Sequence, residues 1–200
     1  MGAPASFYFD LASPLAYFAA ERVLHALPGP AEWQPVLAAE LPGAERFDAF
    51  RCEQEEDVFR AEIARRAQEL HLQPMRWPEP FPFDSALAMR AATYAKSIGR
   101  TVPFAQAAFR QAFAGGRDLQ QIDNVLIAAA ACEMHPAAVT RGAALRSVAD
   151  LLVRTTQHAT LCNIKNVPAI VVGENVYEGE RAIEQAAGQM LADATGAAAR

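Results

Sequence analysis

The spacing of apolar residues predicts a strand, a helix and a second strand at the start of the chain. Residues 7–9, Phe-Tyr-Phe, form an aromatic run bounded by polar and turn residues, which is typical of a short buried strand. From Ser13 onward, apolar residues recur at helical spacing until the Pro-Gly-Pro turn at residues 28–30 ends the pattern. Residues 33–37 indicate another strand, which the proline at position 35 makes irregular or places at a sheet edge.

The middle of the chain, from about residue 44 to residue 153, shows little strand pattern and predicts helices separated by turns. Within it, residues 75–83 (MRWPEPFPF) contain three prolines and predict an irregular aromatic loop. Asp84 and Ser85 can cap the helix that follows, and Gly99 can end it. The predicted helices cover residues 53–70, 85–98, 104–114, 119–133 and 136–154.

The last part of the chain returns to a strand pattern. Residues 169–172 (AIVV) are typical of a strand, residues 173–175 form a turn, and residues 176–177 can pair back as a hairpin. A final helix is predicted over residues 180–191. The order is therefore strand-helix-strand, a helical block, and strand-strand-helix.

This order predicts one α/β domain that is interrupted by an insertion. Residues 1–43 and 154–200 form the sheet domain, and residues 44–153 form an all-helical insertion. The chain has no internal repeat and no low-complexity linker that would indicate a different division.

Composition limits the classes of function. Of the 200 residues, 52% are hydrophobic and 20% are charged, which is enough to bury a core. The net charge of −5, without a basic block, argues against nucleic-acid binding and against an anionic membrane surface. The start of the chain lacks the pattern of a secretory signal, and the longest apolar run, residues 126–132, is too short to span a bilayer. We expect a soluble, cytoplasmic protein.

Cysteine and histidine spacing argues against disulfide and metal sites. Cys52, Cys132 and Cys162 are an odd, widely spaced set without a CxxC pair, so neither a disulfide framework nor a dithiol redox motif is expected. The four histidines match no metal-ligand spacing, and no metal is expected. Cys162 lies five residues before Val167, and we interpret it as a buried spectator.

Ser13 and Pro14 stand where the first strand gives way to the first helix, and they allow two interpretations. As an N-cap, the Ser13 hydroxyl would accept a hydrogen bond from the first turn, with Pro14 at a position where its missing N–H costs nothing. The same helix terminus also carries a positive partial charge that favours a thiolate placed beside it. The residues alone do not choose between a cap and a ligand contact.

Three segments resemble the 2-hydroxychromene-2-carboxylate isomerase family. They are residues 7–17 (FYFDLASPLAY), residues 80–91 (PFPFDSALAMRA) and residues 166–184 (NVPAIVVGENVYEGERAIE), and their order along the chain is that of the family. The family has a thioredoxin fold with a helical insertion, as in DsbA-like proteins and kappa-class glutathione transferases, and a serine replaces its redox cysteine. The resemblance implies the same fold here.

The resemblance also implies a site for glutathione. Ser13 would stabilise the glutathione thiolate, and a cis Val167-Pro168 bond would present the Val167 backbone to the tripeptide. Glu180 and Arg181 would lie near its γ-glutamyl end. The remaining positions implied to contact the ligand are Asn166, Asp84 and Ser85.

Several positions differ from the family pattern. An asparagine of the family is Asp84 here, the glycine before Val-Pro is Asn166, the Trp-Gly pair is Tyr177-Glu178, and the Asp-Arg pair is Glu180-Arg181. Arg60 and Glu62 match charged positions of the family insertion, although on so charged a helix they are expected to be solvated. The aromatic residues of the Pro-rich loop either wall a substrate pocket or pack the insertion core. They are Trp77, Phe81 and Phe83.

The function implied by the resemblance is glutathione-dependent isomerisation of an unsaturated aromatic keto acid through transient thiolate addition. Glutathione is the expected cofactor, a small aromatic molecule the expected substrate, and a homodimer the candidate assembly. The alternatives are a kappa-type glutathione transferase and a non-catalytic thioredoxin-fold binding protein. Dithiol oxidoreductase activity is not expected, because position 13 carries no thiol.

Overall fold

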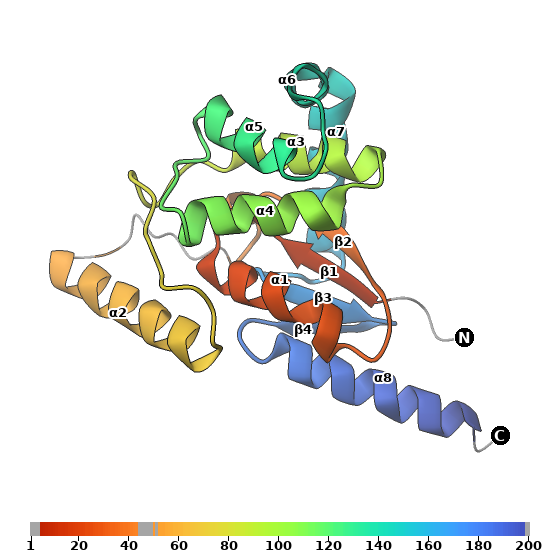
Figure 1. Cartoon of the computed structure of the whole chain (residues 1–200). Helices are drawn as coiled ribbons and strands as arrows, with labels where there is room; N and C mark the ends of the chain where they lie inside the picture. Colours follow the sequence, from red (N-terminus) through yellow and green to blue (C-terminus); the bar gives the residue numbers. More distant parts are fainter. Residues whose placement is uncertain (1–4, 44–49, 51, 199–200) are drawn as a thin grey trace.

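The computed structural model describes residues 5–43, 50 and 52–198 and shows a small sheet with helices packed around it (Figure 1). The strands are β1 (Ala5–Phe9), β2 (Ala31–Pro35), β3 (Ala169–Val172) and β4 (Asn175–Glu178). The helices are α1 (Pro14–Ala26), α2 (Glu53–Glu69), α3 (Ala86–Ser97), α4 (Thr101–Phe113), α5 (Ile122–Ala130), α6 (Pro136–Ala144), α7 (Arg146–Leu161) and α8 (Ala182–Ala198), with a 3₁₀ turn η1 (Ala38–Glu40).

The sheet in the described part of the chain has the strand order β2-β1-β3-β4. β1 pairs in parallel with β2, with Phe7 opposite Trp33, and antiparallel with β3, with Phe7 opposite Ile170. Parallel neighbours need a crossover, which α1 provides, whereas β3 and β4 form a hairpin. The predicted α/β class, with a helical insertion between its two halves, is confirmed. β2 lies at the sheet edge, where its Pro35 is tolerated.

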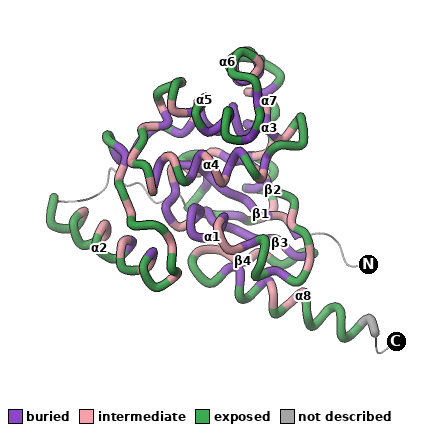
Figure 2. The backbone as a smooth tube through the Cα atoms, in the orientation of Figure 1, coloured by how far each residue is buried: buried purple, intermediate pink, exposed green. Residues whose placement is uncertain are grey.

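Successive side chains of β1 point to opposite faces of the sheet, and each face has its own part of the hydrophobic core. Phe7 and Phe9 point to one face, where both rings contact Trp33 at centroid distances of 4.9 and 5.6 Å. Tyr8 points to the other face and packs in a cluster that includes Ala159 of α7. Figure 2 shows buried backbone running through β1 and through the helix faces around it. Both faces of β1 are covered, which explains its continuous aromatic run.

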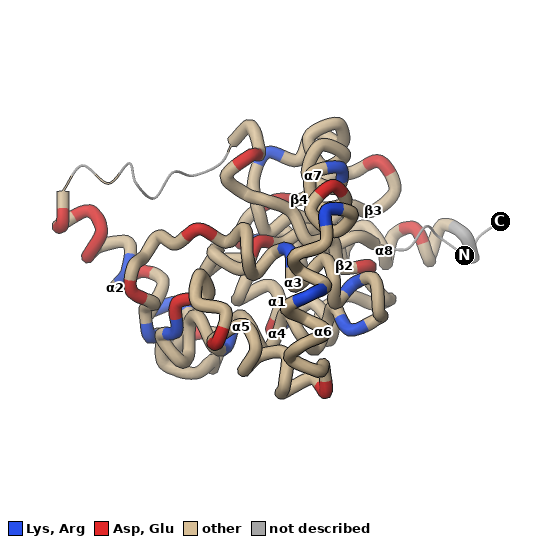
Figure 3. Tube along the Cα trace, turned by 90° about the horizontal axis from the view of Figure 1, so that it is seen from above, with Lys and Arg blue, Asp and Glu red and all other residues tan. Residues whose placement is uncertain are grey.

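α2 stands apart from the rest of the insertion, as a charged surface helix would (Figures 1 and 3). Along its length Ile63 and Ala67 are buried, while its first turns carry acidic residues and its arginines lie in the later turns. An ion pair between Arg66 and Glu180 connects the end of α2 to the segment before α8. The helix predicted over residues 53–70 is confirmed, and most of its charged residues are exposed.

Several predicted helix boundaries are wrong. The single helix expected over residues 136–154 is two helices, α6 and α7, because Leu145 is extended, with φ −65° and ψ 131°. α7 then continues to Leu161, so the predicted domain boundary between residues 153 and 154 falls inside it. The predicted start of the insertion, residue 44, lies outside the described residues.

Two further helices begin later than expected. Residues 119–121 form a turn before α5, in which the Asp118 carboxylate accepts a hydrogen bond from the Gln120 N–H at 2.8 Å. α8 begins at Ala182, because Gly179 has a φ of 76° and turns the chain first. Glu180 and Arg181 therefore precede the helix instead of opening it. In the described ranges, no helix has both the length and the apolar character needed to cross a membrane.

The packing of α6 against α3 depends on the absence of a side chain at Gly142. A Cβ built at this position would overlap the ring of Tyr94, whereas a Cβ built at Gly188 of α8 would meet no atom within 4 Å. We expect Gly142→Ala to destabilise the protein by about 1–3 kcal/mol through overpacking, despite the better helix propensity of alanine.

Gly188→Ala is the matched control, because it changes the same residue type inside a helix without a steric conflict. It should leave stability unchanged or raise it by up to about 1 kcal/mol. Urea unfolding of both variants checks the pair of expectations, and equal effects at the two positions would contradict the close approach of α6 to Tyr94.

Candidate functional site

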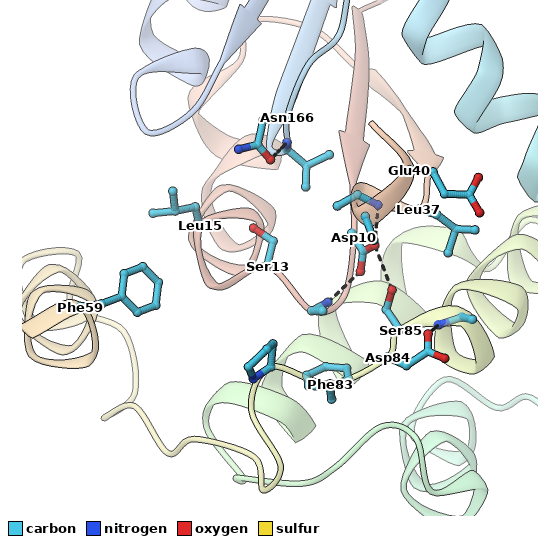
Figure 4. A pocket seen from close by; sticks show the side chains of 16 residues that line it. Asp10, Ser13, Leu15, Leu37, Glu40, Phe59, Phe83, Asp84, Ser85 and Asn166 are labelled. Carbon is cyan, nitrogen blue, oxygen red and sulfur yellow. Dashed lines mark hydrogen bonds between the residues drawn. The ribbon is translucent and has the colours of Figure 1, made fainter. Parts of the chain in front are cut away.

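A cavity of about 590 Å³ lies where β1 and β2 end and α1 and α3 begin (Figure 4). Its walls come from the loop after β1, the segment around η1, the loop before α3, one residue of α2 and the segment before β3. The side chains labelled in Figure 4 are Asp10, Ser13, Leu15, Leu37, Glu40, Phe59, Phe83, Asp84, Ser85 and Asn166.

Ser13 caps α1 and lines this cavity. Its Oγ accepts a hydrogen bond from the Ala16 N–H at 3.2 Å, and Pro14 occupies the first helical position, so the predicted cap is confirmed. A hydroxyl that accepts still has its own proton to donate. In the described part of the chain no acceptor takes the Ser13 proton, and no acceptor takes the N–H of Leu15. Two donors are thus available where the positive end of α1 meets the cavity.

Asp10 is the buried centre of the site, a role that the sequence pattern did not predict. Its Oδ1 accepts from the Ala12 N–H at 2.9 Å. Its Oδ2 accepts from the Ala38 N–H at 2.8 Å and from the Ser85 hydroxyl at 2.9 Å. Burial raises the pKa of this carboxyl, although the three hydrogen bonds oppose the shift. The one signal in the sequence was an acidic residue directly after a buried aromatic strand.

Asp84 and Ser85 were both predicted to cap α3, but only the Asp84 side chain bonds to the start of the helix. The Asp84 carboxylate accepts from the Ala86 N–H at 2.8 Å. Ser85 occupies the cap position, but its hydroxyl makes no capping bond, because it donates to Asp10 instead. Both residues line the cavity, with Asp84 exposed and Ser85 buried.

The segment before β3 forms another wall. The Val167-Pro168 bond is cis, as predicted. Asn166 and Val167 line the cavity, whereas Pro168 lies behind them and its carbonyl accepts from the Gly179 N–H at 2.9 Å. The Val167 N–H is not free for a ligand, because Asn166 Oδ1 accepts its hydrogen bond at 2.8 Å. The sequence pattern did not predict this contact.

The structure does not bring Glu180 and Arg181 into the cavity wall. Glu180 pairs with Arg66 of α2, and Arg181 is exposed at the turn before α8. Cys162 is half-buried at the end of α7, with its Sγ 3.6 Å from His158 Nε2, and it does not line the cavity either.

The aromatic residues of the Pro-rich loop divide between the two predicted roles. Phe83 lines the cavity together with Phe59 of α2. Trp77 and Phe81 pack against each other at a centroid distance of 4.6 Å and support the insertion. The Arg60 guanidinium covers both rings, 5.2 Å from the centre of Trp77, so it is not simply solvated. Glu62 is exposed and pairs with Arg65, as expected for a solvated position.

The ionisable residues in the described cavity wall are all acidic. Asp10, Glu40 and Asp84 contribute carboxyl groups, and no lysine or arginine among the described residues lines the cavity. Over the described ranges, no cluster of three or more His, Cys, Asp or Glu side chains is arranged to hold a metal ion. The chemistry available in the described wall is therefore hydrogen-bond donation, acid or base function at carboxyl groups, and apolar contact.

Asp10→Asn tests the role of the buried carboxyl. Asparagine keeps one acceptor oxygen where Asp10 serves three donors, so we expect a loss of about 1–3 kcal/mol in the free energy of unfolding. Because burial raises the pKa of Asp10, the folded protein holds the proton at pH values where the unfolded chain has lost it. The Asp10 contribution to stability is therefore complete below about pH 4 and falls as pH rises through the folded pKa.

Urea unfolding at a series of pH values checks this expectation. The stability difference between the wild type and Asp10→Asn should narrow as pH rises from about 4 to 8. Asp84→Asn is the matched control, since its amide oxygen can still accept from Ala86, and it should change stability by less than about 0.5 kcal/mol. A difference between the wild type and Asp10→Asn that widens with pH would contradict the raised pKa.

Comparison with known proteins agrees with this architecture. The DSBA-like thioredoxin domain family matches residues 6–191, whereas no curated protein matches the sequence. The structure is similar to that of a 2-hydroxychromene-2-carboxylate isomerase, with a TM-score of 0.78 at 17% identity over 99% of this chain and 97% of the other.

Two further structures are similar. A probable DsbA oxidoreductase from Streptomyces coelicolor has a TM-score of 0.78 at 18% identity, over 96% of this chain and 90% of the other. The cytosolic disulfide reductase DsbM from Pseudomonas aeruginosa, in a structure with GSH, has a TM-score of 0.62 at 11% identity, over 87% and 88% of the two chains. At these identities the similarity establishes the fold. Since the family match spans most of the sequence and the strand order supports it, the chain belongs to the DSBA-like thioredoxin domain family.

Proposed function

We propose that the protein is a glutathione-dependent isomerase that acts on an unsaturated aromatic keto acid. The observation that carries the proposal is the position of Ser13, whose hydroxyl lies at the positive end of α1 on the wall of the 590 Å³ cavity. The hydroxyl and the Leu15 N–H supply two donors at a point where a bound thiolate would need them. Each hydrogen bond to a thiolate lowers the pKa of the glutathione thiol and raises its reactive fraction.

The reaction needs no redox partner. The glutathione thiolate adds to a carbon of the conjugated double bond, so that a C–S bond forms and the π electrons move onto the carbonyl oxygen as an enolate. The former double bond is then single and rotates. Return of the enolate electrons re-forms the double bond and breaks the C–S bond, which releases the thiolate unchanged. One stabilised thiolate is sufficient, which is consistent with a serine at position 13.

The remaining walls suit an aromatic substrate. Phe59 and Phe83 provide an apolar side to the cavity, across from Asn166 (Figure 4), and Pro82 also lines the cavity. The volume lies within the range of about 300–1,000 Å³ that is usual for small-molecule sites. Two of the similar structures support the proposal, because one is named as a 2-hydroxychromene-2-carboxylate isomerase and another was determined with GSH.

A non-catalytic binding protein is the second candidate, and the charge of the cavity favours it. The described wall carries Asp10, Glu40 and Asp84 and no described basic residue, and nearby carboxylates disfavour a thiolate. A kappa-type transferase would use the same site with a different electrophile. Formation of a glutathione thiolate in the cavity would indicate one of the two enzymes instead of the binding protein. Turnover of the keto acid would then indicate the isomerase instead of the transferase.

Reduced glutathione should stabilise the folded protein. At ten times its Kd, a ligand that binds only the native state contributes about 1.4 kcal/mol, which raises Tm by roughly 3–5 °C for a chain of this size. Thermal unfolding across a glutathione titration measures the shift, with S-methylglutathione as a control that binds without forming a thiolate. The absence of any shift at tens of millimolar glutathione would contradict the proposal.

Substitution of Ser13 separates its capping role from its role toward the thiol. Ser13→Ala should lose about 1 kcal/mol of stability, whereas Ser13→Gly should lose only a few tenths, because glycine is also an accepted N-cap. Both variants lack the hydroxyl, so both should raise the pKa of bound glutathione, measured by ultraviolet absorbance of the thiolate. If the thiolate titration is the same in the wild type and in both variants, Ser13 is a cap without a catalytic role.

A further inference from the structure

Three consecutive backbone N–H groups beside the cavity donate to oxygen atoms of the protein's own side chains. The N–H groups of Lys165 and Asn166 both donate to Glu178 Oε1, at 2.5 and 2.9 Å. The next N–H, that of Val167, donates to Asn166 Oδ1 at 2.8 Å (Figure 4). The segment is therefore held by side-chain acceptors up to the point where β3 begins to pair with β1 at Ala169.

The two acceptors act on different sides of this segment. Glu178 belongs to β4 and does not line the cavity, so its two hydrogen bonds fix the backbone from behind. Asn166 does line the cavity, and its side chain occupies the acceptor position of the Val167 N–H. Glycine, which the resembled family has at both of these positions, could supply neither acceptor.

An extended peptide that binds beside a protein strand hydrogen-bonds through its own backbone, and its carbonyl oxygen accepts from a free N–H of the protein. The side-chain amide of Asn166 contains the same chemical group as a peptide carbonyl, so it satisfies the Val167 N–H before any ligand arrives. A peptide that takes this N–H must displace Asn166 Oδ1 and gains no additional hydrogen bond in the exchange.

We infer that Asn166 is a specificity-determining residue, whose side-chain oxygen competes with the carbonyl of a bound peptide thiol for the Val167 N–H. The inference rests on the proposed function, because it takes glutathione as the ligand of this cavity. It predicts that the native protein binds glutathione more weakly than a variant without the competing oxygen. The cavity then favours ligands held by contacts other than the Val167 backbone.

Calorimetric titration with reduced glutathione tests the inference on three proteins. Asn166→Ala removes the competing oxygen and should bind about two- to tenfold more tightly than the wild type, which is the value of one regained hydrogen bond. Asn166→Asp is the matched control, since it keeps an acceptor at the same place and should show no gain. Amide hydrogen exchange provides a second measurement, in which Val167 exchanges faster in unliganded Asn166→Ala and unchanged in Asn166→Asp.

The outcomes separate this inference from the proposed function. If the wild type binds glutathione and Asn166→Ala binds it equally or more weakly, Asn166 is not a competitor and only the inference is overturned. If neither protein binds glutathione, the proposed function fails and the inference fails with it. Tighter binding by Asn166→Ala together with faster exchange at Val167 supports both.

Discussion

The arrangement of the cavity depends on the buried carboxyl group of Asp10. Its two oxygens receive hydrogen bonds from the turn before α1, from the start of η1 and from the hydroxyl at the cap of α3. The carbonyl of the same residue accepts from the Ser13 N–H at 3.1 Å. Segments that are distant along the chain thus meet at one side chain, which offsets the free-energy cost of placing a carboxyl group in the interior.

The sheet explains why these segments meet at this place. β1 and β2 run in parallel, so both end at the same edge, and α1 begins directly after β1 at that edge. Open α/β sheets commonly bind ligands outside the carboxyl ends of such strands. The insertion then closes the site from one side with the loop before α3, and the cis peptide segment before β3 closes it from another. The helix terminus supplies donors, while the neighbouring loops supply carboxyl groups and apolar surface.

The sequence predicts best those features that depend on residues close together along the chain. The Ser13-Pro14 cap, the crossover through α1 and the hairpin of β3 and β4 all follow from local pattern. The cis bond at Pro168 was predicted from the family resemblance, because the spacing of apolar residues does not indicate the isomer of a proline bond. Asp10 could not be identified, because its partners Ala38 and Ser85 are 28 and 75 positions away. A lone acidic residue at a strand end usually faces water.

Other errors had a different origin. The break falls at Leu145, which is neither glycine nor proline, and Gly142 lies inside α6 instead of ending it. The alanine-rich surroundings favour a continuous helix, so the local pattern did not predict two helices. Glu180 and Arg181 were expected in a helical first turn, yet the turn at Gly179 comes before the helix and leaves them outside. The contact between Asn166 and Val167 joins adjacent residues, but it depends on a backbone geometry that only the folded segment provides.

The position of α2 gives the two sides of the cavity different responses to dissolved salt. Phe59 belongs to a helix with few buried residues, and the ion pair between Arg66 and Glu180, with side chains 30% and 49% exposed, helps to hold it. Ionic screening weakens exposed pairs of this kind. Ser13 and Asp10 instead lie in the interior, held by short-range hydrogen bonds that counterions hardly reach. The side of the cavity that α2 provides through Phe59 is thus the part that ionic strength can loosen, whereas the side that holds Ser13 and Asp10 keeps its shape.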